Sequence, residues 1–211
     1  LGLADHPDII AAARNALDEW GFGMASVRFI CGTQTLHKDV EAALSAFLGT
    51  DDTVLYSSCF DANGGVFEVL FGEGDAIISD ELNHASLIDA IRLTRGRRVV
   101  VGHRDVGAVA AALADRPETK AVIVTDAVFS VDGDLAPLRE LQTLAVEHDA
   151  MLIVDEAHSL GVVGDHGEGA AADAGISGEA NVVLTLTLSK SLGSQGGAIA
   201  ADPAIIELLT S

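Results

Sequence analysis

Lys190 is one of only three lysines in the 211-residue chain, and it follows the apolar run VVLTLTL at 182–188. A segment rich in serine and glycine comes directly after it. This position favours burial in a cleft over an ordinary place on the surface. An amine that lies near other cations and away from water loses its proton more readily and becomes nucleophilic. Lys190 could then hold an aldehyde cofactor as a Schiff base, with Thr187 and Ser189 beside it to bind a phosphate.

A carboxylate and an imidazole stand close together in MLIVDEAHSLGVVG at 151–164. Asp155 ends an apolar run, where a carboxylate is costly unless a cation or hydrogen-bond donors meet it. A protonated pyridine nitrogen suits such a carboxylate, and the pair would keep the ring an electron sink, as in pyridoxal phosphate (PLP) chemistry. His158 would then reach the phenolic oxygen of the ring or join an internal hydrogen-bond network. The alternative is an aspartate that caps the next turn and a histidine on the surface.

A phosphate site is predicted in YSSCFDANGG at 56–65, where a strand ends and a helix begins. The backbone N–H groups of Cys59 and Phe60 point outward from the first helical turn, and the helix dipole favours an anion there. The segment contains neither G-x-x-x-x-G-K-[ST] nor G-x-G-x-x-G, so neither a P-loop nor a nicotinamide cofactor is indicated. An ordinary strand-to-helix turn is the alternative.

Metal binding has weak support in the sequence. Asp155, Glu156 and His158 are possible ligands, but the remaining histidines show no spacing that completes a tight site. Cys31 and Cys59 are the only cysteines, too few for a four-thiolate site or a disulfide framework. We therefore predict no metal and a reduced compartment.

The elements that must position these residues follow a repeating pattern, in which short β-branched apolar runs alternate with longer alanine-rich amphipathic segments. This alternation predicts an α/β fold with parallel strands and crossover helices on both faces of the sheet. The runs are apolar throughout, as expected for strands covered on both sides. The expected strands are 53–58, 76–80, 98–102, 121–126, 151–155, 182–188 and 198–201. The expected helices are 7–18, 36–48, 61–71, 84–94, 105–114, 137–148 and 203–210.

Three of the expected strands end in aspartate, at Asp80, Asp126 and Asp155. Ligands gather beyond the carboxyl ends of the strands in parallel α/β sheets, so these residues predict a lined cleft. His84 follows the first of them and could stack on a flat cofactor ring, or face solvent at the start of a helix. Ser130 follows the second and could donate to a cofactor substituent or a substrate carboxylate, although turn chemistry explains the VDGD segment beside it.

The charge and hydropathy of the chain exclude some partners. Net charge is −20, from 32 acidic and 12 basic residues, which argues against nucleic acid and anionic membranes. No apolar segment reaches the roughly 20 residues of a membrane helix, and the start, LGLADHPDII, has no signal-peptide pattern. A cytoplasmic location is predicted. The acidity has two open explanations, a salt-rich cytoplasm or a GC-rich genome.

Five segments occur in the order found in the α-oxoamine synthases, which are fold-type-I PLP enzymes that condense an amino acid with an acyl-CoA. They are SSCFDANGG, NHASLIDAIRL, TDAVFSVDGD, VDEAHSLGVVG and TLSKSLGSQGG. The chain resembles this family over essentially its whole length. GFGMASVRFICGTQTLHKDVE at 21–41 and SSCFDANGG look most like the glycine C-acetyltransferases, also called 2-amino-3-ketobutyrate CoA ligases. TLSKSLGSQGG and TDAVFSVDGDLAPLREL look as much like the 8-amino-7-oxononanoate synthases.

The resemblance implies roles for four catalytic residues. Lys190 resembles the lysine that forms the Schiff base with PLP and then acts as the base. Asp155 resembles the partner of the pyridine nitrogen, and His158 the partner of the ring oxygen. His84 resembles the histidine that stacks on the ring.

The remaining cofactor contacts are implied in the same way. Cys59 and Phe60 resemble the residues that bind the phosphate through their backbone. Ser130 and Thr187 would complete the pocket. Asp126 stands where some members of the family carry glutamate, so no role is carried over to it.

The implied reaction condenses glycine with acetyl-CoA to give 2-amino-3-oxobutyrate and CoA, and the homodimer is the implied assembly. The alternative reaction joins alanine to a pimeloyl thioester, with decarboxylation, in biotin synthesis. Residues 1–211 would form the PLP-binding major domain, because the family also has an N-terminal arm and a C-terminal small domain that this chain lacks. Two other possibilities are an aminotransferase or lyase on the same fold and an inactive truncated domain.

Overall fold

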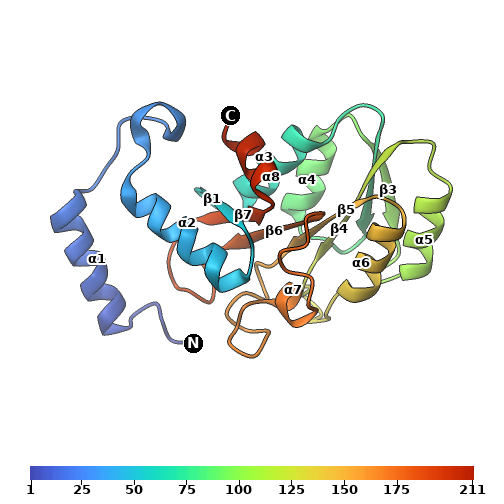
Figure 1. Ribbon diagram of the computed structural model, residues 1–211. Coiled ribbons are helices and arrows are strands. Elements are labelled where there is room, and N and C mark those ends of the chain that lie inside the picture. The colour runs from blue at the N-terminus through green and yellow to red at the C-terminus, as the bar shows by residue number, and fades with distance from the viewer.

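A seven-stranded sheet crosses the middle of the molecule, with helices on both of its faces (Figure 1). The computed structural model describes all 211 residues. The strands are β1 (Asp52–Tyr56), β2 (Asp75–Asp80), β3 (Arg97–Val101), β4 (Lys120–Asp126), β5 (Met151–Asp155), β6 (Val182–Thr187) and β7 (Gly197–Ala201). Their order across the sheet is β1-β7-β6-β5-β4-β2-β3.

The helices divide between the two faces of the sheet. They are α1 (Pro7–Trp20), α2 (Thr35–Leu48), α3 (Cys59–Leu70), α4 (Ala85–Leu93), α5 (Val106–Ala114), α6 (Leu138–Glu147), α7 (Ala170–Asp173) and α8 (Pro203–Thr210), with a single wide turn at Arg28–Gly32. The apolar cluster on one face takes buried residues from α2, α5, α6 and α7. The cluster on the other face takes them from α3, α4 and α8.

The central strands contribute alternate side chains to these two clusters. In β4, Ala121 and Ile123 belong to the α5–α6 face, while Val122 and Val124 belong to the α3–α4 face. The alternation follows from the period of two residues in a strand. Both faces are therefore apolar, which is why these segments read as continuous apolar runs in the sequence.

The seven strands and seven helices expected from the sequence are all present, with ends that differ by at most two residues. The expectation of parallel pairing fails at β7, which runs antiparallel to both β6 and β1. A parallel neighbour needs a long crossover, usually a helix, and residues 188–196 join β6 to β7 without one. The remaining neighbours are parallel, so the sheet is mainly parallel, as predicted.

The carboxyl ends of six strands, all except β7, lie at one edge of the sheet. Strands β4, β5 and β6 are parallel neighbours, and Asp126 lies in register with Asp155. Strand β1 has the same direction as β6, because both are antiparallel to β7. The chain therefore leaves β1 at this edge, and α3 begins there.

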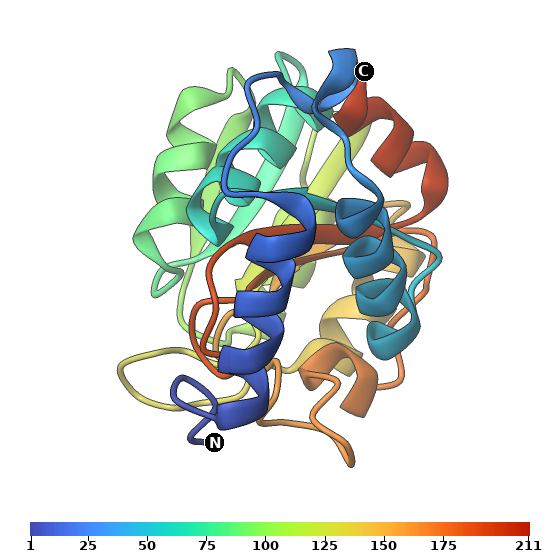
Figure 2. The same ribbon diagram turned by 90° about the vertical axis from the view of Figure 1, so that its left-hand side faces the viewer.

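Helix α1 stands apart from the sheet in Figure 1, and in the turned view of Figure 2 it lies in front of the rest of the chain. It has no buried residue, although its sequence is amphipathic. Trp20 and the following Phe22 are exposed large hydrophobic residues of this N-terminal region. None of the helices combines the length and the apolar character that a membrane span requires.

Candidate active site

A cavity of about 230 Å³ opens at the edge where β1, β4, β5 and β6 end. It is lined by Ser58, Cys59, Phe60, His84, Ser86, Asp126, Asp155, Ala157, His158, Thr187, Ser189 and Lys190. Seven of the eight site residues predicted from the sequence lie in this lining. Ser130 does not: it is exposed in the turn after β4, where residues 128 and 135 form an isolated antiparallel bridge.

Asp155 lies at the floor of the cavity and is 4% exposed. One carboxylate oxygen accepts a hydrogen bond from the Ala157 backbone nitrogen at 2.9 Å. The other accepts one from Asn63 Nδ2 at 2.8 Å. The Cys59 sulfur lies 3.8 Å from both oxygens. Burial, and next the charge of Asp155, raises the pKa of the Cys59 thiol, so the sulfur keeps its proton and donates.

Lys190 is paired with His158 at the mouth of the cavity, where Nζ lies 2.7 Å from His158 Nε2. Burial, followed by the charge of Lys190, lowers the pKa of His158. The ring is therefore neutral near pH 7, and Nε2 accepts the hydrogen bond. The prediction of a buried Lys190 was wrong for this chain, because the side chain is exposed. β6 ends at Thr187, and the lysine follows in the loop that leaves the sheet.

The N-terminus of α3 faces the same cavity. The amides of Cys59 and Phe60 donate no hydrogen bond within the chain, whereas the Asp61 amide is capped by Ser58 Oγ at 3.0 Å. Strand β7 supports this turn at very close range, since a Cβ at Gly197 would lie 2.3 Å from the Cys59 nitrogen. Two free amides at a helix N-terminus are suited to bind an anion.

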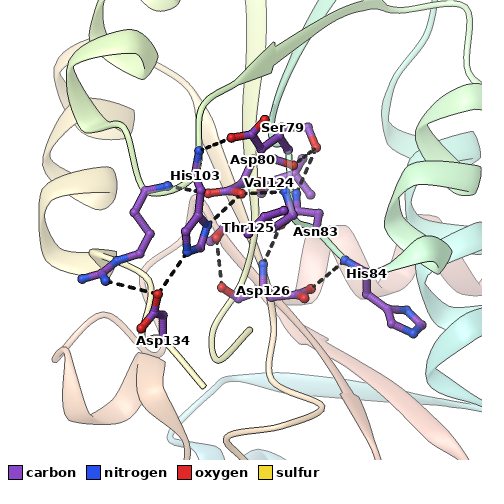
Figure 3. Close-up of polar contacts among 12 residues, drawn as sticks. Ser79, Asp80, Asn83, His84, His103, Val124, Thr125, Asp126 and Asp134 are labelled. Carbon is purple, nitrogen blue, oxygen red and sulfur yellow. Dashed lines mark hydrogen bonds and ion pairs between the residues drawn. The ribbon is translucent and has the colours of Figure 1, made fainter. Parts of the chain in front are cut away.

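Asp126 lines the cavity, although the sequence assigned no role to this residue. It is 2% exposed, and its carboxylate accepts only one hydrogen bond, a long one from the His84 backbone nitrogen at 3.4 Å. Burial, together with the nearby Asp155, raises the pKa of Asp126 to about 7. Figure 3 shows this contact and the His84 ring pointing away from the carboxylate.

Asp80, the third strand-end aspartate, lies outside the cavity. Its partners are His103 Nδ1 at 3.2 Å and the amides of Leu82 and Arg104. His103 in turn reaches Asp134 at 3.3 Å (Figure 3). Ser79 pairs with Val124, so Asp80 is one step out of phase with Asp126. Side chains alternate between faces along a strand, and Asp80 therefore points to the α5–α6 side.

Two polar residues of the site were missed in the sequence: Ser86, which lines the cavity, and Asn63, which lies behind it. Asn63 stands four residues after Cys59, which places it one helical turn behind the anion site, and Ser86 stands two residues after His84. Both are almost fully buried. The spacing of Asn63 within SSCFDANGG was the signal that could have found it.

The residues of the cavity fit pyridoxal 5'-phosphate. Asp155 is buried but forms no ion pair, whereas the ion pairs of this region lie at Asp80 and Asp134. A pyridinium nitrogen would supply the missing cation. The free amides of α3 suit a phosphate, and the Lys190 amine suits an aldehyde.

Comparisons with known proteins agree with this fit. The family model described as aminotransferase class I and II matches residues 1–211. The 8-amino-7-oxononanoate synthase of Mycolicibacterium smegmatis is 50% identical over 205 residues, which are 97% of this chain and 54% of that protein. The 2-amino-3-ketobutyrate coenzyme A ligase of Escherichia coli K12 is also 50% identical, over 213 residues that cover 99% of this chain and 53% of the ligase. The chain spans about half the length of these curated relatives.

Solved structures show the same fold. The Sphingomonas wittichii serine palmitoyltransferase superposes with a TM-score of 0.92 at 38% identity, over 99% of this chain and 52% of that one. A structure of SPT with PLP gives the same TM-score at 34% identity, over 99% of this chain and 52% of that one. The PLP transferase fold and the cofactor, pyridoxal 5'-phosphate, are thus as predicted. The resemblance to the α-oxoamine synthases is confirmed, and the chain belongs to the aminotransferase class I and II family.

Proposed function

We propose that this chain carries the cofactor site of a PLP-dependent C-acyltransferase, which joins a small amino acid to the acyl group of an acyl-CoA. The observation that supports this most is the shared cavity of Asp155 and Lys190. The free amides of Cys59 and Phe60 face the same space. A carboxylate for the ring nitrogen, an amine for the aldehyde and two amides for the phosphate would thus meet in one cavity.

Each residue has a defined task in this proposal. PLP, when bound, supplies an electron sink for the carbanion that forms at the amino-acid α-carbon. Asp155 holds a positive ring nitrogen in place with a carboxylate that Ala157 and Asn63 orient. Lys190 Nζ would hold the aldehyde carbon of the cofactor, and its amine would be the base for the α-proton of the substrate. The neutral His158 keeps Nζ aimed into the cavity by accepting its N–H.

Glycine and acetyl-CoA are the proposed substrates, with 2-amino-3-oxobutyrate and CoA as products. The N-terminal segment 21–41 is the part of the sequence that favours them over alanine and a pimeloyl thioester. Relatives of both kinds match at the same 50% identity. CoA release should be measured with each substrate pair on the full-length protein. Faster release with alanine and the pimeloyl thioester would select the alternative.

Trapping the cofactor tests the site itself. After incubation with PLP and reduction with borohydride, mass spectrometry of peptides should find the cofactor on the peptide that contains Lys190. The Lys190→Ala variant should lose the label, and the control Lys120→Ala should keep it. A label on Lys38 or Lys120 instead would refute the assignment of Lys190. No label on any lysine would favour the inactive domain. The homodimer stays a prediction.

A further inference from the structure

Asn63 is the one side chain that donates a nitrogen-based hydrogen bond to the Asp155 carboxylate. It lies on α3, and its Nδ2 is 2.8 Å from Asp155 Oδ2. The Cys59 thiol, on the same helix, is a weaker donor at 3.8 Å. The carboxylate is therefore oriented by one backbone amide from its own loop and one side-chain amide from α3.

The hydrogen bonds of Asn63 show which of its two polar atoms matters. The side chain is fully buried. Both hydrogens of Nδ2 are used, one toward Asp155 and one toward Ser86 Oγ at 2.9 Å. The carbonyl oxygen has no partner, which is costly for a buried acceptor. The reverse orientation would place this oxygen against a carboxylate, so the position uses the asparagine for its donors.

The second bond of Asn63 leads to His84. Ser86 Oγ lies 2.7 Å from His84 Nδ1, and the Ser86 amide also donates to Nδ1 at 3.2 Å. A backbone amide can only donate, so Nδ1 is an acceptor and the ring proton is on Nε2. The amide contact is long, and the shorter bond from Ser86 Oγ supplies most of the preference for this tautomer. Ser86 Oγ accepts from Asn63 and gives its own hydrogen to Nδ1. The donors thus run in one direction, from Asn63 through Ser86 to His84.

We propose that Asn63 is a positioning residue of the cofactor site, which orients the Asp155 carboxylate and, through Ser86, fixes His84 as its Nε2–H tautomer. The effect of Asn63 on PLP binding rests on the proposed function, whereas its effect on the His84 tautomer does not. Because α3 also presents the amides of Cys59 and Phe60, one helix sets the phosphate end and the ring-nitrogen end of the site together. The separation of these two ends is then fixed by a single rigid element.

The first experiment reads the tautomer without cofactor. Long-range ¹H–¹⁵N NMR spectra of the cofactor-free chain should show His84 as the Nε2–H form at pH 8. In Asn63→Leu and in Ser86→Ala, the spectrum should move toward a mixture of both tautomers. Asn181→Leu is the matched control, since Asn181 also bonds a buried network, through Ala150 and Gln142, but outside the cavity. An unchanged Nε2–H form in both test variants would overturn the proposal.

The second experiment measures PLP affinity by visible absorbance. Asn63→Leu should weaken binding by about tenfold or more, because one hydrogen bond to a charged group is lost. Asn63→Asp should weaken it at least as much, since it places a second carboxylate beside Asp155. Asn181→Leu should bind PLP as the unchanged chain does. If the unchanged chain binds no PLP, the proposed function fails, whereas the tautomer measurement still decides the hydrogen-bond relay. Unaltered affinity in both Asn63 variants would refute the positioning role.

Discussion

Asp80 and Asp155 both end a parallel strand at the same edge of the sheet, yet their surroundings differ. The Asp80 carboxylate finds all its partners within the chain, namely two backbone amides and His103. Asp155 has donors but no cation, and it faces a cavity. The carboxylate of Asp126, its neighbour in register, accepts a single long hydrogen bond. A buried carboxylate whose partners all come from its own chain is structural. One that lacks a cationic partner marks the place of a ligand.

Removing the negative charge at each of the two sites gives the sharpest test of this difference. Asp155→Asn should weaken PLP binding by about a hundredfold, because a neutral amide cannot pair with a pyridinium. Asp80→Asn should leave PLP affinity unchanged and lower the free energy of unfolding by about 1–3 kcal/mol, since an amide hydrogen would meet a backbone N–H. Absorbance titration and urea unfolding measure the two effects. Equal losses of affinity in both variants would contradict the comparison.

The raised pKa of Asp126, about 7, makes stability depend on pH. Between about pH 4 and pH 7 the unfolded chain loses this proton while the folded chain keeps it. The free energy of unfolding therefore falls as pH rises through that window. Asp126→Asn should remove the fall and stabilise the cofactor-free chain at pH 8 by up to about 4 kcal/mol. Urea unfolding at pH 4 and pH 8 would show this, and a pH-independent difference would count against it.

His103 gives the smallest effect; stability again falls as pH rises, but here the substitution should destabilise the chain. Desolvation opposes the charged ring, but hydrogen bonds to Asp80 and Asp134 outweigh it and raise the pKa of His103. The stabilisation is therefore complete below the unfolded pKa, about 6.5, and is lost as pH rises through the folded pKa. His103→Gln should cost below about 1 kcal/mol at pH 5.5 and less at pH 9. An equal loss at both pH values would show that the ring stabilises the cluster by packing on Phe129 instead.

Much of the fold was predictable because its signals are local. Each strand is an apolar run, and each helix has an apolar stripe bounded by caps such as Ser58 and Asp202. The reversal of β7 was not predictable from alternation, because it depends on a loop that returns without a helix. The exposure of Lys190 and the place of Ser130 outside the cavity depend on where loops turn after the strands end.

The sequence by itself determined the element order, the cofactor chemistry and most of the residues that line the cavity. These follow from residue types within short segments, and such local patterns can be recognised without knowledge of the fold. Only the tertiary structure decided which strand-end aspartates act together. Asp126 and Asp155 share a face because they lie in register, while Asp80 is one step out of phase and faces the other side. Register is set between strands, and with a period of two a single step reverses the face.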